Sequence, residues 1–80
     1  MNFKNNSVEK FMSKIKIILN GEEKTLSHNT TIAALIAEYE LDIKKIAIEK
    51  DLEIVNPNNF AEIILDEGCR IEIVHFIGGG

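Results

Sequence analysis

The chemically most informative residues are the last three, Gly78, Gly79 and Gly80, which directly follow a segment with the alternating pattern of a β-strand. Glycine has no Cβ, so such a run lets a backbone enter a narrow channel without steric clashes. We expect the carboxylate of Gly80 to be the least hindered carboxyl group of the chain. An ionised carboxylate resists nucleophiles, but it attacks the α-phosphate of ATP when a partner supplies the nucleotide, Mg²⁺ and charge stabilisation. The tail is therefore a candidate substrate handle, and the alternative is a frayed, linker-like end.

A docking surface for such a partner is expected on the strand before the glycines. Alternation over residues 70–76 places Ile71, Ile73 and His75 on one face, which we expect to be the core side. The other face carries Glu72 and an apolar pair beside the reactive end, which suits a binding hot spot. The predicted docking residues are Val74, Phe76, Ile77 and, if the first and last strands are neighbours, Ile18. The alternative is that the apolar residues at the end of this strand only cover the edge of the core.

The remaining reactive side chains form no catalytic or metal-binding motif. His28 and His75 have no cysteine or carboxylate nearby at the spacing of metal ligands. Cys69 follows a turn glycine, and we expect it to pack as a small hydrophobic residue. The chain contains no P-loop, dinucleotide fingerprint or nucleophile–base pair. We therefore predict no metal site, no catalytic residue and no cofactor bound by the chain itself.

The composition indicates a small, acidic, single-domain protein. The chain has 80 residues, of which 45% are hydrophobic, and 13 acidic against 9 basic residues give a formal net charge of −4. This balance argues against a nucleic-acid partner. The longest apolar run, Ile32–Ala37, is too short to span a bilayer, and the start of the chain has no secretory signal. A single cysteine excludes an internal disulfide and suits a reducing compartment, so we predict a cytoplasmic protein without a membrane partner.

The acidic residues leave two interpretations open. They form either a solvated face or a surface that steers the protein towards basic partners. The residues concerned are Glu49, Glu53, Glu62, Asp66, Glu67 and Glu72.

A hairpin opens the part of the chain that must position the tail. Alternation of apolar and polar residues over residues 14–19 predicts a strand. Asn20-Gly21 follows and is a strong hairpin signal, because both positions tolerate a positive φ. A return strand over residues 24–27 completes the hairpin, and a two-residue turn places Leu26 opposite Ile15.

One main helix is expected next, over residues 32–40. Thr30 or Thr31 can cap its first free amides. Apolar residues at i, i+3, i+4 and i+7 form one buried stripe. These residues are Ile32, Leu35, Ile36 and Tyr39. Leu41 is expected to fold back over the end of the helix.

The second half of the chain predicts strands and tight turns. The expected strands are residues 46–50, 53–55 and 70–76, with turns at Asp51 and at 66–68, and a loop at 56–59 that Phe60 anchors on the core. The order of hairpin, helix and strands indicates a two-layer α+β fold. We predict a flexible or extra N-terminal arm over residues 1–12, a folded domain over 13–77 and a flexible reactive tail over 78–80.

Several short segments together carry a family resemblance. In chain order they are Ile17-Ile18-Leu19-Asn20-Gly21-Glu22, Thr31-Ile32-Ala33-Ala34-Leu35-Ile36, Ala47-Ile48-Glu49, Asp66-Glu67-Gly68 and the final residues 71–80. With these segments in this order and spacing, the chain from about Ser13 to Gly80 resembles the ThiS sulfur carriers, a family of ubiquitin-like β-grasp proteins. The resemblance implies a mixed sheet of four to five strands packed on one main helix. Residues 1–11 depart from the family, as does Lys50-Asp51, which stands where many members have an Asn-Gly turn.

The resemblance also implies a function and partners. A ThiF-type adenylating enzyme, using its own ATP and Mg²⁺, converts the Gly80 carboxylate to an acyl-adenylate. Sulfur from a cysteine desulfurase or another donor then replaces AMP, and the resulting thiocarboxylate donates sulfur to thiazole synthase for the thiazole ring of thiamin. In this scheme Gly79 and Gly80 enter the partner's channel, and Gly78 is a flexible spacer. The protein is thus expected to be a cosubstrate and not an enzyme.

Two rival functions stay open. One is a related sulfur carrier, such as the small subunit of molybdopterin synthase, although that family commonly ends in two glycines after an alanine. The other is a ubiquitin-like modifier or binding module, whose tail would join lysine side chains. Thiocarboxylate formation fits either carrier, whereas isopeptide adducts select the modifier.

Overall fold

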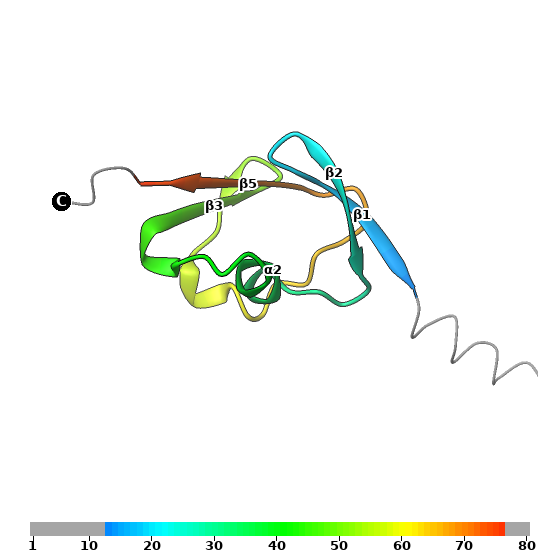
Figure 1. Ribbon diagram of the computed structural model, residues 1–80, viewed down its shortest axis with the longest axis horizontal. Helices are drawn as coiled ribbons and strands as arrows, with labels where there is room; N and C mark the ends of the chain where they lie inside the picture. Colours follow the sequence, from blue (N-terminus) through cyan, green and yellow to red (C-terminus); the bar gives the residue numbers. More distant parts are fainter. Residues whose placement is uncertain (1–12, 77–80) are drawn as a thin grey trace, which may run out of the picture.

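The fold is an α+β sandwich of one sheet and one main helix. A computed structural model describes residues 13–76, so the predictions for residues 1–12 and 77–80 lie outside the described residues. The strands are β1 (Lys14–Leu19), β2 (Glu22–Ser27), β3 (Ile46–Lys50), β4 (Glu53–Ile54) and β5 (Arg70–His75); the helices are α2 (Ile32–Glu38) and two 3₁₀ turns, Ile43–Lys45 and Pro57–Asn59. The five strands form a single mixed sheet in the order β2-β1-β5-β3-β4, and α2 lies against one face (Figure 1). The α+β prediction is confirmed.

The first hairpin forms as predicted. Leu26 lies opposite Ile15, and Leu19 opposite Glu22 closes a two-residue turn. Asn20-Gly21 takes φ values of 49° and 86° there, so both residues are left-handed, as a hairpin turn that follows the sheet's twist requires.

The helix starts at a cap that the sequence left as one of two threonines. Thr31 is the N-cap, and its Oγ1 accepts a hydrogen bond of 3.1 Å from the amide of Ala34. The neighbouring segment around Ile64 forms an isolated antiparallel bridge with Thr31. The start of the helix is thereby tied both to its own first turn and to the long connection that leads to β5.

The end of the helix corrects one prediction. The helix stops at Glu38, and Glu40 adopts a left-handed φ of 56°, which turns the chain back. Leu41 then donates its amide to the Ile36 carbonyl at 3.2 Å, as its expected fold-back requires. Tyr39 therefore lies beyond the last helical turn and is 43% exposed, so its assignment to the buried stripe is wrong.

The core lies between the helix and the sheet. Its buried members are Ile17, Leu26, Ile32, Leu35, Ile36, Ile46, Ile48, Phe60, Leu65, Cys69 and Ile71. Both the predicted loop anchor, Phe60, and Cys69 belong to it, with 2% and 3% exposure. Burial raises the pKa of the Cys69 thiol, so this side chain stays protonated and packs as a small hydrophobic residue, as expected.

The turn between β3 and β4 contains a strained residue. Asp51 and Leu52 both have left-handed φ values, of 51° and 74°. Aspartate tolerates this region through its short polar side chain, but leucine does so at a cost. The Leu52 side chain is 78% exposed, so no packing compensates for the strain.

We predict that Leu52→Gly raises the free energy of unfolding by about 1 kcal/mol, because glycine adopts a positive φ without a Cβ clash. Urea unfolding followed by circular dichroism measures the change. Leu52→Ala is the matched control, since it removes the same exposed side chain but keeps Cβ, and it should give no such gain. Equal stability of the glycine and alanine variants would contradict a backbone origin.

Candidate functional site

The candidate site starts from β5, the strand that leads towards the glycines. It occupies the middle of the sheet (Figure 1). On one side it runs parallel to β1, with Leu19 opposite Ile71. On the other side it runs antiparallel to β3, from Lys50 opposite Ile71 to Ile46 opposite His75. Sheet neighbours on both sides thus hold the start of β5, and β3 alone continues beside it to His75.

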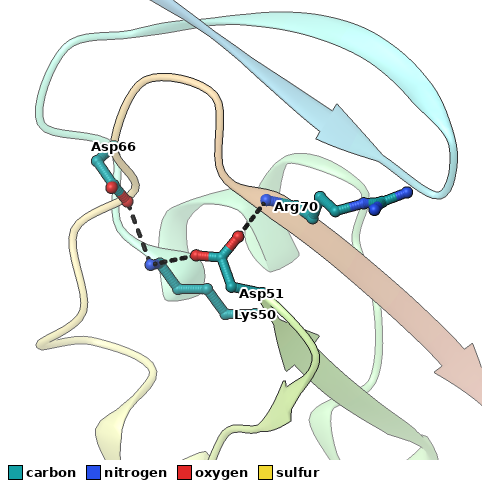
Figure 2. Close-up of polar contacts among 4 residues, drawn as sticks. All are labelled: Lys50, Asp51, Asp66 and Arg70. Carbon is teal, nitrogen blue, oxygen red and sulfur yellow. Dashed lines mark hydrogen bonds and ion pairs between the residues drawn. The ribbon is translucent and has the colours of Figure 1, made fainter.

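An ion-pair network holds the first residue of β5. Asp51 Oδ1 accepts a 2.9 Å hydrogen bond from the amide of Arg70 (Figure 2). In the other direction, the Asp51 amide donates to the Arg70 carbonyl at 2.8 Å. Lys50 Nζ lies 3.2 Å from both the Asp51 and the Asp66 carboxylates. The bond from the Arg70 amide and the adjacent Lys50 ammonium together lower the pKa of Asp51. The network joins the β3–β4 turn to the turn that precedes β5.

A second contact holds the middle of β5. Asn20 Oδ1 accepts a 2.7 Å hydrogen bond from the amide of Ile73, and the Asn20 amide donates to the Ile71 carbonyl at 2.8 Å. The Asn20 side chain thus takes the place of the next residue of β1, at the point where the hairpin turns away. Hairpin turn and β5 are linked across 53 residues of sequence.

The predicted docking residues within the described range lie on the outer face of the sheet, away from α2. Val74 and Phe76 are 51% and 57% exposed, while Ile71 is fully buried on the opposite face. Ile18 is partly buried and pairs with Arg70 on β5. With a rise of about 3.3 Å per residue, Arg70 lies roughly 13 Å from Val74 along the strand. Ile18, which lies beside Arg70, is therefore well separated from Val74. Ile77 and the three glycines lie outside the described residues, and the docking role stays a prediction.

The outer face contains further residues that the sequence did not indicate. Ala47 lies directly opposite Val74, and Glu49 lies opposite both Glu72 on β5 and Ile54 on β4. Ile54 is 69% exposed. We call Ala47, Ile54, Val74 and Phe76 the outer apolar residues; with two facing glutamates between them, they form a mixed apolar and acidic surface. Only the pairing of β3 with β4 and β5 reveals this grouping, because alternation within one strand does not show which strands are neighbours.

The histidine, cysteine and acidic side chains of residues 13–76 form no metal-binding cluster. Both histidines are exposed. Over residues 13–76, no three His, Cys, Asp or Glu side chains are arranged to hold a metal ion. The helices of this range are also too short or too polar to cross a membrane.

Comparison with known proteins identifies relatives over most of the chain. A model of the ThiS family matches residues 17–80. The chain is 40% identical over 63 residues to the sulfur carrier protein ThiS of Bacillus subtilis, covering 78% of this chain and 96% of that protein. It is also 42% identical over 66 residues to a thiazole synthase of Paramagnetospirillum magneticum, but there it spans only 20% of the relative's length.

A solved structure supports the fold. The crystal structure of the thiamine biosynthesis protein (ThiS) from Geobacter metallireducens superposes with a TM-score of 0.72, over 82% of this chain and 100% of that one. Sequence identity is 19%, so the likeness speaks for the fold alone. It confirms the ubiquitin-like β-grasp prediction of a mixed sheet on one main helix.

We predict that Asn20→Gly lowers the free energy of unfolding by about 1 kcal/mol, since it removes the acceptor of the Ile73 amide but preserves the left-handed turn. Hydrogen exchange of the Ile73 amide should accelerate more than that of Val74, which faces β3. Asn20→Asp retains an acceptor at this position and is the matched control. If the glycine variant exchanges at the wild-type rate at Ile73, the side-chain bond does not hold β5.

Proposed function

The chain belongs to the ThiS family, and we propose that it is a sulfur carrier of thiamin biosynthesis whose C-terminal Gly80 bears the transferred sulfur. The observation that carries this proposal is that the family match runs through residue 80, and so includes the glycines. The fold supports it, because β5 directs the chain towards these glycines from the centre of the sheet. The proposal requires that Gly80 end the mature chain.

The proposed chemistry uses the carboxylate as a nucleophile first and as an activated acyl group afterwards. One Gly80 oxygen attacks the α-phosphorus of ATP, which releases pyrophosphate and leaves an acyl-adenylate. Sulfide attacks the acyl carbon, expels AMP and gives the thiocarboxylate directly. The persulfide of a donor protein instead gives an acyl disulfide, from which an external thiol releases the thiocarboxylate and forms a disulfide with the donor cysteine. A ThiF-type partner binds the ATP and Mg²⁺, and a cysteine desulfurase or another donor supplies the sulfur. The carrier contributes the reactive end and the surface that presents it, and is not itself an enzyme.

Thiazole synthase is the proposed acceptor of the sulfur. Two relatives named thiazole synthase each contain a segment similar to this chain within a protein about five times longer, since the match covers 20% of their length. A carrier-like segment within the same polypeptide supports a functional association between the two activities. The ATP-dependent steps and this acceptor support our proposal of a cytoplasmic location.

We predict that incubation with a ThiF-type enzyme, ATP, Mg²⁺ and a sulfur source replaces one oxygen of the Gly80 carboxylate by sulfur. Top-down mass spectrometry measures the change in the C-terminal fragment. Fragment localisation is necessary because oxidation of Met1 or Met12 adds nearly the same mass. The intact mass of the purified protein is measured first, to establish that the chain ends at Gly80.

A chain that lacks Gly79 and Gly80 is the control for this experiment, and it should show no shift. If Gly80 of the full chain keeps its carboxylate while the same enzyme modifies another carrier, sulfur transfer is excluded. Isopeptide adducts on lysines in the same spectra would instead identify a protein modifier.

We further propose that the outer apolar residues dock the adenylating partner. Val74→Asp should lower the partner's kcat/KM for this carrier at least about tenfold, because a charge replaces an exposed apolar contact beside the tail. ATP–pyrophosphate exchange measures the effect. Thr25→Asp is the matched control, since Thr25 is exposed on the same face but on the distant edge strand β2. A folded Val74→Asp variant with wild-type exchange would place docking elsewhere.

A further inference from the structure

The backbone of β5 has an open edge near its C-terminal end. The Phe76 amide donates to the Lys45 carbonyl at 2.9 Å, so the even-numbered residues of this strand direct their backbone groups towards β3. The odd-numbered residues point to the other side, where the Ile71 carbonyl accepts from the Asn20 amide and the Ile73 amide donates to Asn20 Oδ1. Beyond this point β1 has turned away into β2.

Two backbone groups are consequently left without a strand beside them. These are the Ile73 carbonyl and the His75 amide, and the structure gives neither a hydrogen-bond partner among residues 13–76. His75 and Ile46 on β3 form a non-hydrogen-bonded pair of the antiparallel ladder. The His75 amide therefore does not donate to β3 either. β5 is therefore flanked by two strands where it begins, at Arg70 and Ile71, and is an edge strand at its last residues.

A groove lies beside this open edge, on the face of the sheet that carries α2. Its volume is about 390 Å³. The lining residues are Leu19, Asn20, Glu22, Tyr39, Leu41, Ile73 and His75, which come from the first hairpin, the end of the helix and β5. Among these seven, Glu22 is the one acidic residue. The groove thus combines an apolar floor, one anionic side chain and a strip of free backbone.

We propose that this edge binds an extended segment of a partner protein, which adds a short strand beside β5 and places an aliphatic side chain, flanked by Arg or Lys, in the groove. The free carbonyl of Ile73 and amide of His75 require a partner that offers one donor and one acceptor at strand spacing, which an extended backbone provides. The apolar floor selects the aliphatic side chain, and Glu22 selects the basic ones. This surface lies on the opposite face from the outer apolar residues, and the proposal does not rest on the sulfur-carrier function.

The small number of contacts at the open edge of β5 limits the expected affinity for a peptide. Two backbone hydrogen bonds and one buried aliphatic side chain give weak binding for a free peptide, with a dissociation constant in the millimolar range. The same segment becomes effective as part of a partner that also contacts another surface, because the second contact is then intramolecular.

The test uses the full-length ¹⁵N-labelled chain and three peptides, acetyl-Arg-Thr-Xaa-Thr-Arg-Thr-amide with Leu, Ile or Phe as Xaa. Without peptide, the His75 amide should exchange faster with solvent than the Val74 amide. At millimolar peptide, we expect a saturable shift of the His75 amide resonance and slower exchange at this residue. The same peptides with N-methylated central amides, or with Glu in place of Arg, should bind at least about tenfold more weakly.

Matched protein variants separate the backbone from the side chain. His75→Pro removes the free amide without the loss of an internal hydrogen bond, and should bind the peptides at least about tenfold more weakly than His75→Ala, which also loses the imidazole that lines the groove but keeps the amide. Glu22→Gln should weaken binding of the Arg peptides alone. Thermal unfolding of each variant verifies that the fold is intact.

Three results would overturn the proposal. One is the absence of a saturable shift at His75 with all three peptides. Another is equal binding of the folded His75→Pro and His75→Ala variants. The third is protection of the His75 amide that increases with protein concentration in the absence of peptide, because a second copy of the chain then occupies the edge.

Discussion

The position of β5 between β1 and β3 is the constraint on which the rest of the structure depends. Within the sheet of residues 13–76, β5 lies at the centre and joins the hairpin to the β3–β4 pair. Its hydrogen bonds continue to Phe76, whose amide donates to the Lys45 carbonyl at 2.9 Å. The described part of the chain ends there, at Phe76, four residues before Gly80.

The sequence predicted those features that depend on neighbouring residues. Asn20-Gly21 indicated the hairpin, and the spacing of Ile32, Leu35 and Ile36 indicated the buried helix face. Tyr39 fitted the same spacing, but the left-handed Glu40 ends the helix before Tyr39 reaches the core. Helix periodicity does not include the geometry of its termination, which is why this prediction was wrong.

The contacts that position the site could not be predicted because they join distant residues. Asn20 holds Ile73 across 53 positions, and Asp51 holds Arg70 across 19. Judged from their sequence neighbours alone, Asn20 and Asp51 are turn residues. Their side-chain oxygens then have many possible hydrogen-bond partners. The docking residues were predictable in part. Alternation within one strand placed Val74 and Phe76 on the outer face. That Ala47 and Ile54 lie on the same surface follows only from the register of β3 with β4 and β5.

The burial of the Cys69 thiol affects which groups of the chain can accept transferred sulfur. It is the chain's single cysteine, is 3% exposed, and its pKa is raised by burial. Thiol–disulfide exchange and persulfide transfer both require an accessible thiolate, so this side chain is a poor acceptor for either reaction. Sulfur delivered to this chain by a donor therefore meets no accessible thiol among its side chains.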